Sequence, residues 1–192
     1  KPIIISTGLA DLSLLKKLYL KIKKKWGTFN KSRFLIFLHC VASYPVPIEE
    51  SNIHLISLFK KTFKDIFIGY SDHVQGIDAS ILSATLGAKI IEKHFTLDKN
   101  FSDFRDHQIS ADPQEMKILV SKIRQIEKIF SKSPFKQPSC EKKNIKNLRR
   151  SLAASKNLEK GRRIKKEDLI WVRPQSGDIT EKDLIGKKLK KE

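Results

Sequence analysis

The chain has 192 residues, 40% of them hydrophobic and 31% charged, and this balance excludes an intrinsically disordered protein. No apolar run approaches the roughly 20 residues of a membrane helix, and the N-terminus has no signal-peptide pattern, so we expect a soluble protein. The formal net charge of +18 is typical of nucleic-acid binders, but the lysines gather on helix faces with few aromatic residues between them, and we interpret those faces as solvated.

The first part of the chain alternates short apolar runs with amphipathic segments. Runs rich in β-branched and aromatic residues predict strands at Pro2 to Ser6 and at Arg33 to Cys40. Each is followed by leucines and isoleucines at helical spacing, which predict helices from Leu9 to Leu20 and from Ile53 to Phe63. The order is strand, helix, strand, helix.

The same alternation continues along the chain. Asp65 to Gly69 and Ala88 to Ile91 are predicted strands, with a helix rich in Ala and Leu between them from Ile77 to Leu86. A long loop from Thr96 to Ala111 then leads to Asp112, which precedes a proline and stands three residues before a glutamate, a pattern typical of a helix start.

Continuously apolar strands that alternate with helices indicate a parallel sheet, because parallel neighbours need helical crossovers. No Gly-x-Gly-x-x-Gly follows any predicted strand, so a dinucleotide-binding sheet has no support. We expect half of a barrel. The four missing strand–helix units would precede Lys1, and we therefore expect the chain to be truncated at its N-terminus.

A boundary is predicted in the polar, proline-containing segment after the last long helix. Beyond it, Ser151 to Ala154 is strand-like, Glu159 to Gly161 is a turn, and the similar segments 166–170 and 181–185 predict short helical turns. We expect a barrel-type domain over 1–131, a linker over 132–147 and a small β-rich domain over 148–192, whose marginal core we expect to lean on the barrel or on a partner subunit.

The two cysteines, Cys40 and Cys140, lie far apart and form neither a disulfide framework nor a metal motif. This usage is typical of a reducing compartment, and we expect a cytoplasmic protein.

Active sites of parallel barrels lie at the carboxyl ends of the strands. His73 and His94 each follow a predicted strand, and consecutive strands are neighbours, so the two imidazoles could converge on one divalent ion. For each histidine alone we would favour a hydrogen-bonded strand-end residue, but the pair at matched strand ends weakens that interpretation. We interpret His39 as structural and His54 as solvated.

Other strand-end groups allow two readings each. Ser71 is placed to bind an anion or to cap a helix, and for Thr7 we favour capping. Asp106 and His107 fit an ordinary exposed loop pair, and Arg173 fits either an anion clamp or a surface residue.

Successive blocks of this sequence resemble, in order, those of the sialic acid synthase family, which includes N-acetylneuraminate, legionaminate and pseudaminate synthases. The blocks are KPIIISTG, HCVASYPVP, IGYSDHVQG, LGAKIIEKHFTLDKN, DHQIS with DPQE, SPFKQP, RRSLAA and VRPQSGDI. The resemblance implies an α/β fold: the C-terminal half of a (β/α)8 TIM barrel followed by a small β-rich SAF (antifreeze-like) domain, here incomplete.

The resemblance also implies a reaction, the condensation of phosphoenolpyruvate with an N-acylated hexosamine such as N-acetylmannosamine to give a nonulosonic acid and phosphate. His73 and His94 match histidines that hold Mn2+ or Mg2+. Ser71 matches a phosphate-contacting serine and Tyr44 a phosphoenolpyruvate-site tyrosine, while Glu92 and Asp106 match carboxylates near the sugar and the water. Arg173 matches an arginine that reaches the sugar in the other subunit of a domain-swapped homodimer.

We expect this piece alone to be inactive, because the lysines that hold phosphoenolpyruvate in the family belong to the missing strands. Two alternatives remain open: another phosphoenolpyruvate-dependent keto sugar acid synthase, and a non-catalytic module that binds carbohydrate or nucleic acid.

Overall fold

The computed structural model describes residues 2–27, 34–102, 105–130, 138–174, 177 and 179–190. The chain divides into two compact units, Lys1–Ser131 and Lys132–Glu192. Each unit is described by itself.

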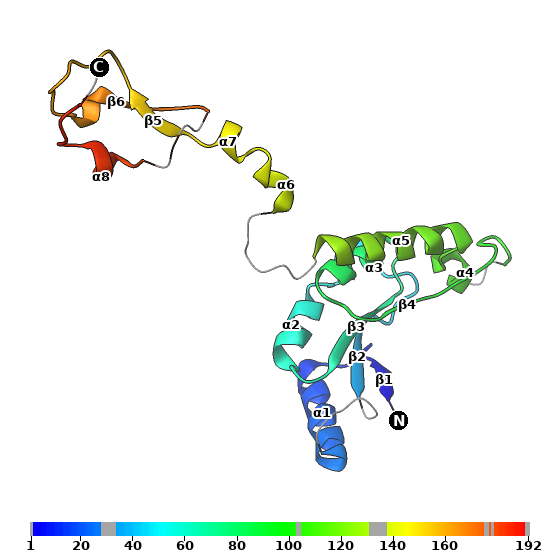
Figure 1. The fold of residues 1–192 in the computed structure, drawn as a ribbon. Helices are drawn as coiled ribbons and strands as arrows, with labels where there is room; N and C mark the ends of the chain where they lie inside the picture. The colour runs from blue at the N-terminus through cyan, green and yellow to red at the C-terminus, as the bar shows by residue number, and fades with distance from the viewer. Residues whose placement is uncertain are drawn as a thin grey trace. The chain divides into compact units, whose positions relative to one another are not determined.

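The first unit is built on a curled parallel sheet in which spatial order follows chain order, β1-β2-β3-β4 (Figure 1). Its strands are β1 (Ile3–Ser6), β2 (Leu35–Cys40), β3 (Phe67–Asp72) and β4 (Ile91–Lys93). All three pairings are parallel. Sequential parallel strands joined by helices form half of a barrel, which confirms the predicted α/β architecture.

Helices connect the strands, as the alternation predicted. They are α1 (Leu12–Trp26), the short 3-10 helix η1 (Ile48–Glu50), α2 (Leu55–Thr62), α3 (Asp78–Thr85), α4 (Arg105–Ile109) and α5 (Pro113–Ile129). The start of α5 has the predicted capping box: Asp112 accepts from the backbone N–H of Glu115 at 2.8 Å, and Glu115 accepts from that of Asp112 at 3.2 Å. Asp11 caps α1 by accepting from Leu14 N–H at 2.7 Å.

The core of this unit lies between β2, β3 and the helices. Leu35 to Leu38 are all buried, because one face of β2 meets the helices and the other lines the inside of the curled sheet. Phe37 contacts Phe63 edge to face with ring centroids 5.2 Å apart. Truncation of such a buried phenylalanine to alanine costs about 3–5 kcal/mol of stability.

Two strands lie further along the chain than the sequence predicted. Strands expected at Asp65 to Gly69 and Ala88 to Ile91 lie two to three residues further on, at Phe67–Asp72 and Ile91–Lys93. The apolar run marks where each strand enters the core, but the hydrogen-bonded ladder continues past it into polar residues. Arg33, at the predicted start of β2, lies outside the described residues.

Two further expectations were wrong. The predicted loop from Thr96 to Ala111 contains the short helix α4, which carries Asp106 and His107. Thr7 caps no helix, because its hydroxyl donates to Leu38 O at 2.9 Å and ties β1 to the neighbouring strand.

The second unit contains a two-stranded antiparallel sheet, β5 (Ser151–Ala154) with β6 (Leu169–Val172). Its other elements are the short helices α6 (Ser139–Lys142), α7 (Ile145–Leu148), η2 (Lys166–Asp168) and α8 (Glu181–Leu184). The predicted strand at β5 and the turn at Gly161 are confirmed. The predicted linker is partly helical where it is described, and Leu169 and Ile170 belong to β6 rather than to a helical turn.

A buried carboxylate organises the second unit. Asp168 is 0% exposed and accepts from both Nε and Nη2 of Arg162, at 3.2 and 2.9 Å, and from Lys165 N–H at 3.0 Å. The Lys165 amide and the Arg162 guanidinium lower the pKa of this carboxyl group. The Asp168 carboxylate thereby holds together residues of the loop between β5 and β6.

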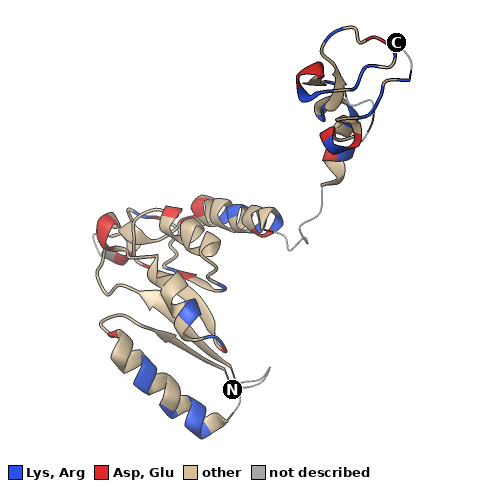
Figure 2. Ribbon diagram, turned by 90° about the vertical axis from the view of Figure 1, so that its left-hand side faces the viewer, with Lys and Arg blue, Asp and Glu red and all other residues tan. Residues whose placement is uncertain are grey.

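Basic residues recur along α1, where Lys16, Lys17, Lys21, Lys24 and Lys25 are exposed (Figure 2). In α5 and in the second unit, both basic and acidic residues occur along the ribbon. Within the described ranges, no helix has the length and apolar character needed to cross a membrane.

Candidate active site

The predicted site residues of the first unit gather at the carboxyl ends of β3 and β4. Ser71 and Glu92 are direct partners in the β3–β4 register, and the Ser71 hydroxyl donates to Glu92 Oε1 at 2.6 Å. Both side chains point to the same face of the sheet, because paired residues of adjacent strands do so. The sheet therefore presents a hydroxyl and a carboxylate side by side.

His73 and His94 stand two residues beyond this pair and follow the same alternation. Their ring centroids are 5.4 Å apart. Nδ1 of His73 lies 2.9 Å from Val41 O, so in the neutral ring that nitrogen is the protonated donor and Nε2 keeps its lone pair. The predicted convergence of the two imidazoles is present in the structure.

Tyr44, in the loop after β2, covers the histidines. Its ring centroid is 4.1 Å from that of His73 and 5.8 Å from that of His94. Partial burial raises the pKa of the Tyr44 phenol, and the nearby carboxylates of Asp106 and Glu92 raise it further. The phenol therefore stays protonated at neutral pH and can donate a hydrogen bond.

Sequence reasoning assigned no role to Cys40, which the structure places at this edge. Its Sγ lies 3.9 Å from His73 Nδ1, and burial raises the pKa of the thiol. A protonated thiol is a poor nucleophile and a poor metal ligand. Cys40 therefore packs against the imidazole and is not expected to act as a ligand itself.

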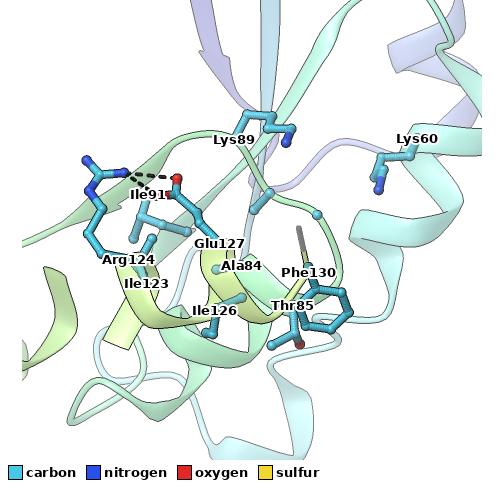
Figure 3. Close-up of a pocket in the computed structure, with 12 residues that line it drawn as sticks. Lys60, Ala84, Thr85, Lys89, Ile91, Ile123, Arg124, Ile126, Glu127 and Phe130 are labelled. Carbon is cyan, nitrogen blue, oxygen red and sulfur yellow. Dashed lines mark hydrogen bonds and ion pairs between the residues drawn. The ribbon is translucent and has the colours of Figure 1, made fainter. Parts of the chain in front are cut away.

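A hollow of about 150 Å3 opens at this edge, lined by Ser71, Asp72, His73, Glu92, Lys93 and His94. A larger hollow of about 490 Å3 lies near the opposite end of β4, between α3 and the C-terminal half of α5 (Figure 3). Its lining mixes aliphatic and charged residues, and two of the charged residues, Arg124 and Glu127, pair with each other at 2.9 Å. Volume alone would favour the larger hollow, but the smaller one contains the histidines, the carboxylate and the hydroxyl that chemistry requires.

The remaining candidates are placed as follows. His39 is 3% exposed and its Nε2 lies 2.8 Å from Ser51 O, which confirms it as structural, and His54 is exposed as expected. Asp106 is half-buried on α4, while its neighbour His107 contacts Thr96 Oγ1 through Nδ1 at 2.9 Å. Arg173 is exposed at the end of β6 in the second unit.

The donor set at the edge fits a divalent ion that keeps open positions. Among the residues described, no group of three or more His, Cys, Asp or Glu side chains forms a closed metal cage. Two neutral imidazoles suit ions such as Mn2+, and the other coordination sites would be left to water and substrate oxygens. The fixed tautomer of His73 is an arrangement found in metal-binding histidines.

Comparison with known proteins identifies the family. The sequence matches the NeuB family over residues 1–134 and the SAF domain over residues 149–192. The chain belongs to the NeuB family. The NeuB match covers the unit that contains the parallel sheet, and the SAF match covers the unit that contains β5 and β6.

Several curated NeuB relatives are similar along most of the chain. The N,N'-diacetyllegionaminic acid synthase of Campylobacter jejuni subsp. jejuni serotype O:2 is 42% identical over 92% of this chain and 52% of its own length. The N-acetylneuraminate-9-phosphate synthase of Homo sapiens is 36% identical over 84% of this chain and 43% of its own length. The chain spans about half the length of the curated relatives it matches.

A solved structure with the NeuB fold is the N-acetylneuraminic acid (sialic acid) synthetase of Leptospira borgpetersenii serovar Hardjo-bovis in complex with citrate. It aligns with a TM-score of 0.65 and 35% identity, over 74% of this chain and 47% of that one.

Proposed function

We propose that this chain is part of an enzyme that condenses phosphoenolpyruvate with an N-acylated hexosamine to form a nonulosonic acid and phosphate. The observation that carries the proposal is the pairing of His73 and His94 beside the Ser71–Glu92 hydrogen bond, at matched ends of adjacent strands. The similarity to named synthases of legionaminic, pseudaminic and N-acetylneuraminic acids supports the same class of reaction.

In this proposal His73 and His94 hold a divalent ion, Mn2+ or Mg2+. When bound, such an ion supplies Lewis acidity toward the aldehyde oxygen of the open-chain sugar. The two imidazoles lie close together, and Val41 O fixes the direction of the His73 ring.

The reaction joins the enol carbon of phosphoenolpyruvate to the aldehyde carbon, adds water at C2 and breaks the bond to the phosphate oxygen. The Ser71 hydroxyl would bind the phosphate, and the protonated phenol of Tyr44 would donate to the same substrate. Glu92, which is exposed at the edge, would accept a proton from the incoming water. Asp106, near enough to Tyr44 to influence its phenol, would bind the sugar.

Arg173 belongs to the SAF unit, and we propose that it contacts the sugar bound by the partner subunit of a homodimer. Its exposure at the end of β6 leaves the guanidinium available for such a contact. A guanidinium has five N–H donors, which the hydroxyl and N-acyl oxygens of the sugar can accept. We also propose a cytoplasmic location, on the evidence of cysteine usage.

The test is an assay of the full-length protein with phosphoenolpyruvate, N-acetylmannosamine and Mn2+, in which phosphate release is followed with and without a chelator. We expect release that the chelator stops and added Mn2+ restores. The assay is repeated with the diacetylated hexosamine precursors of legionaminic and pseudaminic acids. No phosphate release with any N-acyl hexosamine would contradict the proposal.

A further inference from the structure

A buried ion pair lies on the opposite face of β3 and β4 from the two imidazoles. Lys93 Nζ is 3.3 Å from Asp72 Oδ2, and the side chains are 1% and 0% exposed. The two residues are direct partners in the strand register. Because side chains alternate along a strand, each charged residue points away from the histidine that follows it.

Asp72 is held by neighbours from three elements. The hydroxyl of Ser80 on α3 donates to Oδ2 at 2.6 Å, the Tyr70 hydroxyl donates to Oδ1 at 3.2 Å, and Val74 N–H donates to Oδ1 at 2.9 Å. Ser80 is itself 0% exposed. The carboxylate thus joins the helix, the strand and the turn that follows the strand, with both oxygens occupied.

The same network fixes the backbone that follows the His73 side chain. Asp72 accepts from Val74 N–H, and the Lys93 ammonium donates to Val74 O. Val46 N–H donates to His73 O at 3.0 Å. The polar backbone atoms that follow the His73 side chain are therefore set by Asp72, Lys93 and the loop that carries Tyr44.

We propose that Asp72 and Lys93 are positioning residues, which hold the ends of β3 and β4 so that His73 and His94 face one ion. The inference rests on the proposed function, in which these histidines hold that ion. A stability role alone would not require an ion pair here, since a buried pair replaced by apolar residues of similar volume often leaves stability unchanged. The orientation of the two histidines does require a rigid support, because metal ligands must stay within about 0.5 Å of their working geometry.

The experiment uses four variants of the protein. Three are single changes, Lys93→Met, Lys93→Arg and Ser80→Ala, and the fourth combines Asp72→Asn and Lys93→Met in one chain. In the full-length protein the experiment measures the Kd for Mn2+ by electron paramagnetic resonance, without substrate, and the Tm of the metal-free protein. The matched control is Lys23→Met, which removes a Lys–Asp pair of the same unit: Lys23 and Asp65 are 2.5 Å apart and both partly exposed.

We expect Lys93→Met to raise the Kd for Mn2+ about tenfold, the low end of the effect of losing an outer partner, because Lys93 holds the backbone beside His73 and not the ring itself. Lys93→Arg keeps the charge and should recover most of the affinity. The double variant should recover much of the Tm, because no unpaired charge stays buried, while its affinity stays low. Ser80→Ala removes one hydrogen bond to Asp72 and should raise the Kd by roughly two- to fivefold, and Lys23→Met should leave it unchanged.

The inference is overturned if the double variant or Ser80→Ala binds Mn2+ as wild type does, and these two milder changes decide the matter if Lys93→Met does not fold. The proposed function fails separately. If wild type binds Mn2+ through His73 but releases no phosphate, the reaction is wrong and the positioning role stands. If wild type releases phosphate but binds Mn2+ no better than His73→Ala, the positioning role falls alone, and if it does neither, both fall.

Discussion

Both units of the chain contain a buried carboxylate, and the two are held in different ways. Asp72 has partners on three different elements, β3, β4 and α3, and its cation Lys93 lies on the neighbouring strand. Asp168 is bound from within its own loop, by Arg162 and by the amide of Lys165.

The difference indicates two roles for a buried carboxylate, one that supports a binding site and one that supports only the fold. The Asp72 network lies beside residues that we propose to be catalytic, so its loss should disturb binding as well as stability. The Asp168 network closes a loop in a unit with few large buried side chains, so its loss should disturb mainly that unit's fold. The following changes test this separation, from the largest expected effect to the smallest.

His73→Ala should lower Mn2+-dependent phosphate release by the full-length protein at least about 100-fold, since a ligand contributes more than the outer partners that supply 10- to 100-fold. Steady-state kinetics measures the change. The matched control is His54→Ala, an exposed histidine of the same unit, which should keep wild-type turnover. Unchanged turnover in His73→Ala would remove the metal assignment.

Asp168→Ala should lower the melting temperature of the second unit by more than about 5 °C, because Arg162 and the Lys165 amide lose their shared acceptor. Differential scanning calorimetry measures the transition. The Kd for Mn2+ should not change. A loss of metal affinity equal to that of Lys93→Met would show that the two carboxylates are not separate in function.

Tyr44→Phe should lower kcat/KM about tenfold, equivalent to about 1.4 kcal/mol, the size expected for one lost hydrogen bond to substrate. The phenylalanine ring can still cover His73, so the Kd for Mn2+ should stay at the wild-type value. An equal loss in both quantities would mean that the tyrosine acts through the histidines.

The second unit should become less stable in acid. The folded pKa of Asp168 is lowered, so its contribution to the free energy of unfolding is fully present above the unfolded value of about 4 and is lost as the pH falls toward the folded pKa. Urea titrations between about pH 5 and pH 3 measure the slope. Asp183, whose pKa the Thr180 hydroxyl lowers, adds a change of the same sign, and Asp183→Asn isolates the part due to Asp168.

Much of the first unit could be predicted from sequence, because apolar runs and helical spacing report burial directly. The same signal misplaced β3 and β4, since a strand end that lines a site is polar and its last residues resemble a loop. Helix α4 was missed for a related reason: among its four residues whose burial the structure describes, only Ile109 is buried, which is too little for a periodic pattern.

The histidines could be predicted because strand ends in a parallel sheet meet at one edge. Asp72 and Lys93 were overlooked, although the order of residues contains a signal for them. Each directly precedes one of the two histidines on adjacent strands, and their charges are opposite. Charged residues that a strand points toward its covering helices must be paired, because an unpaired charge there is costly. Cys40 gave no such signal, since its role depends on packing alone.

The hydrogen bond from Val46 N–H to His73 O joins the loop that carries Tyr44 to the segment that carries His73. Its amide proton is therefore protected from solvent exchange only while these two segments are docked. In a deuterium-exchange experiment this one amide would report the integrity of the whole edge in the absence of any substrate or ion. A slow rate at Val46 would mean that the edge is preformed, and a fast rate would mean that it assembles when its ligands arrive.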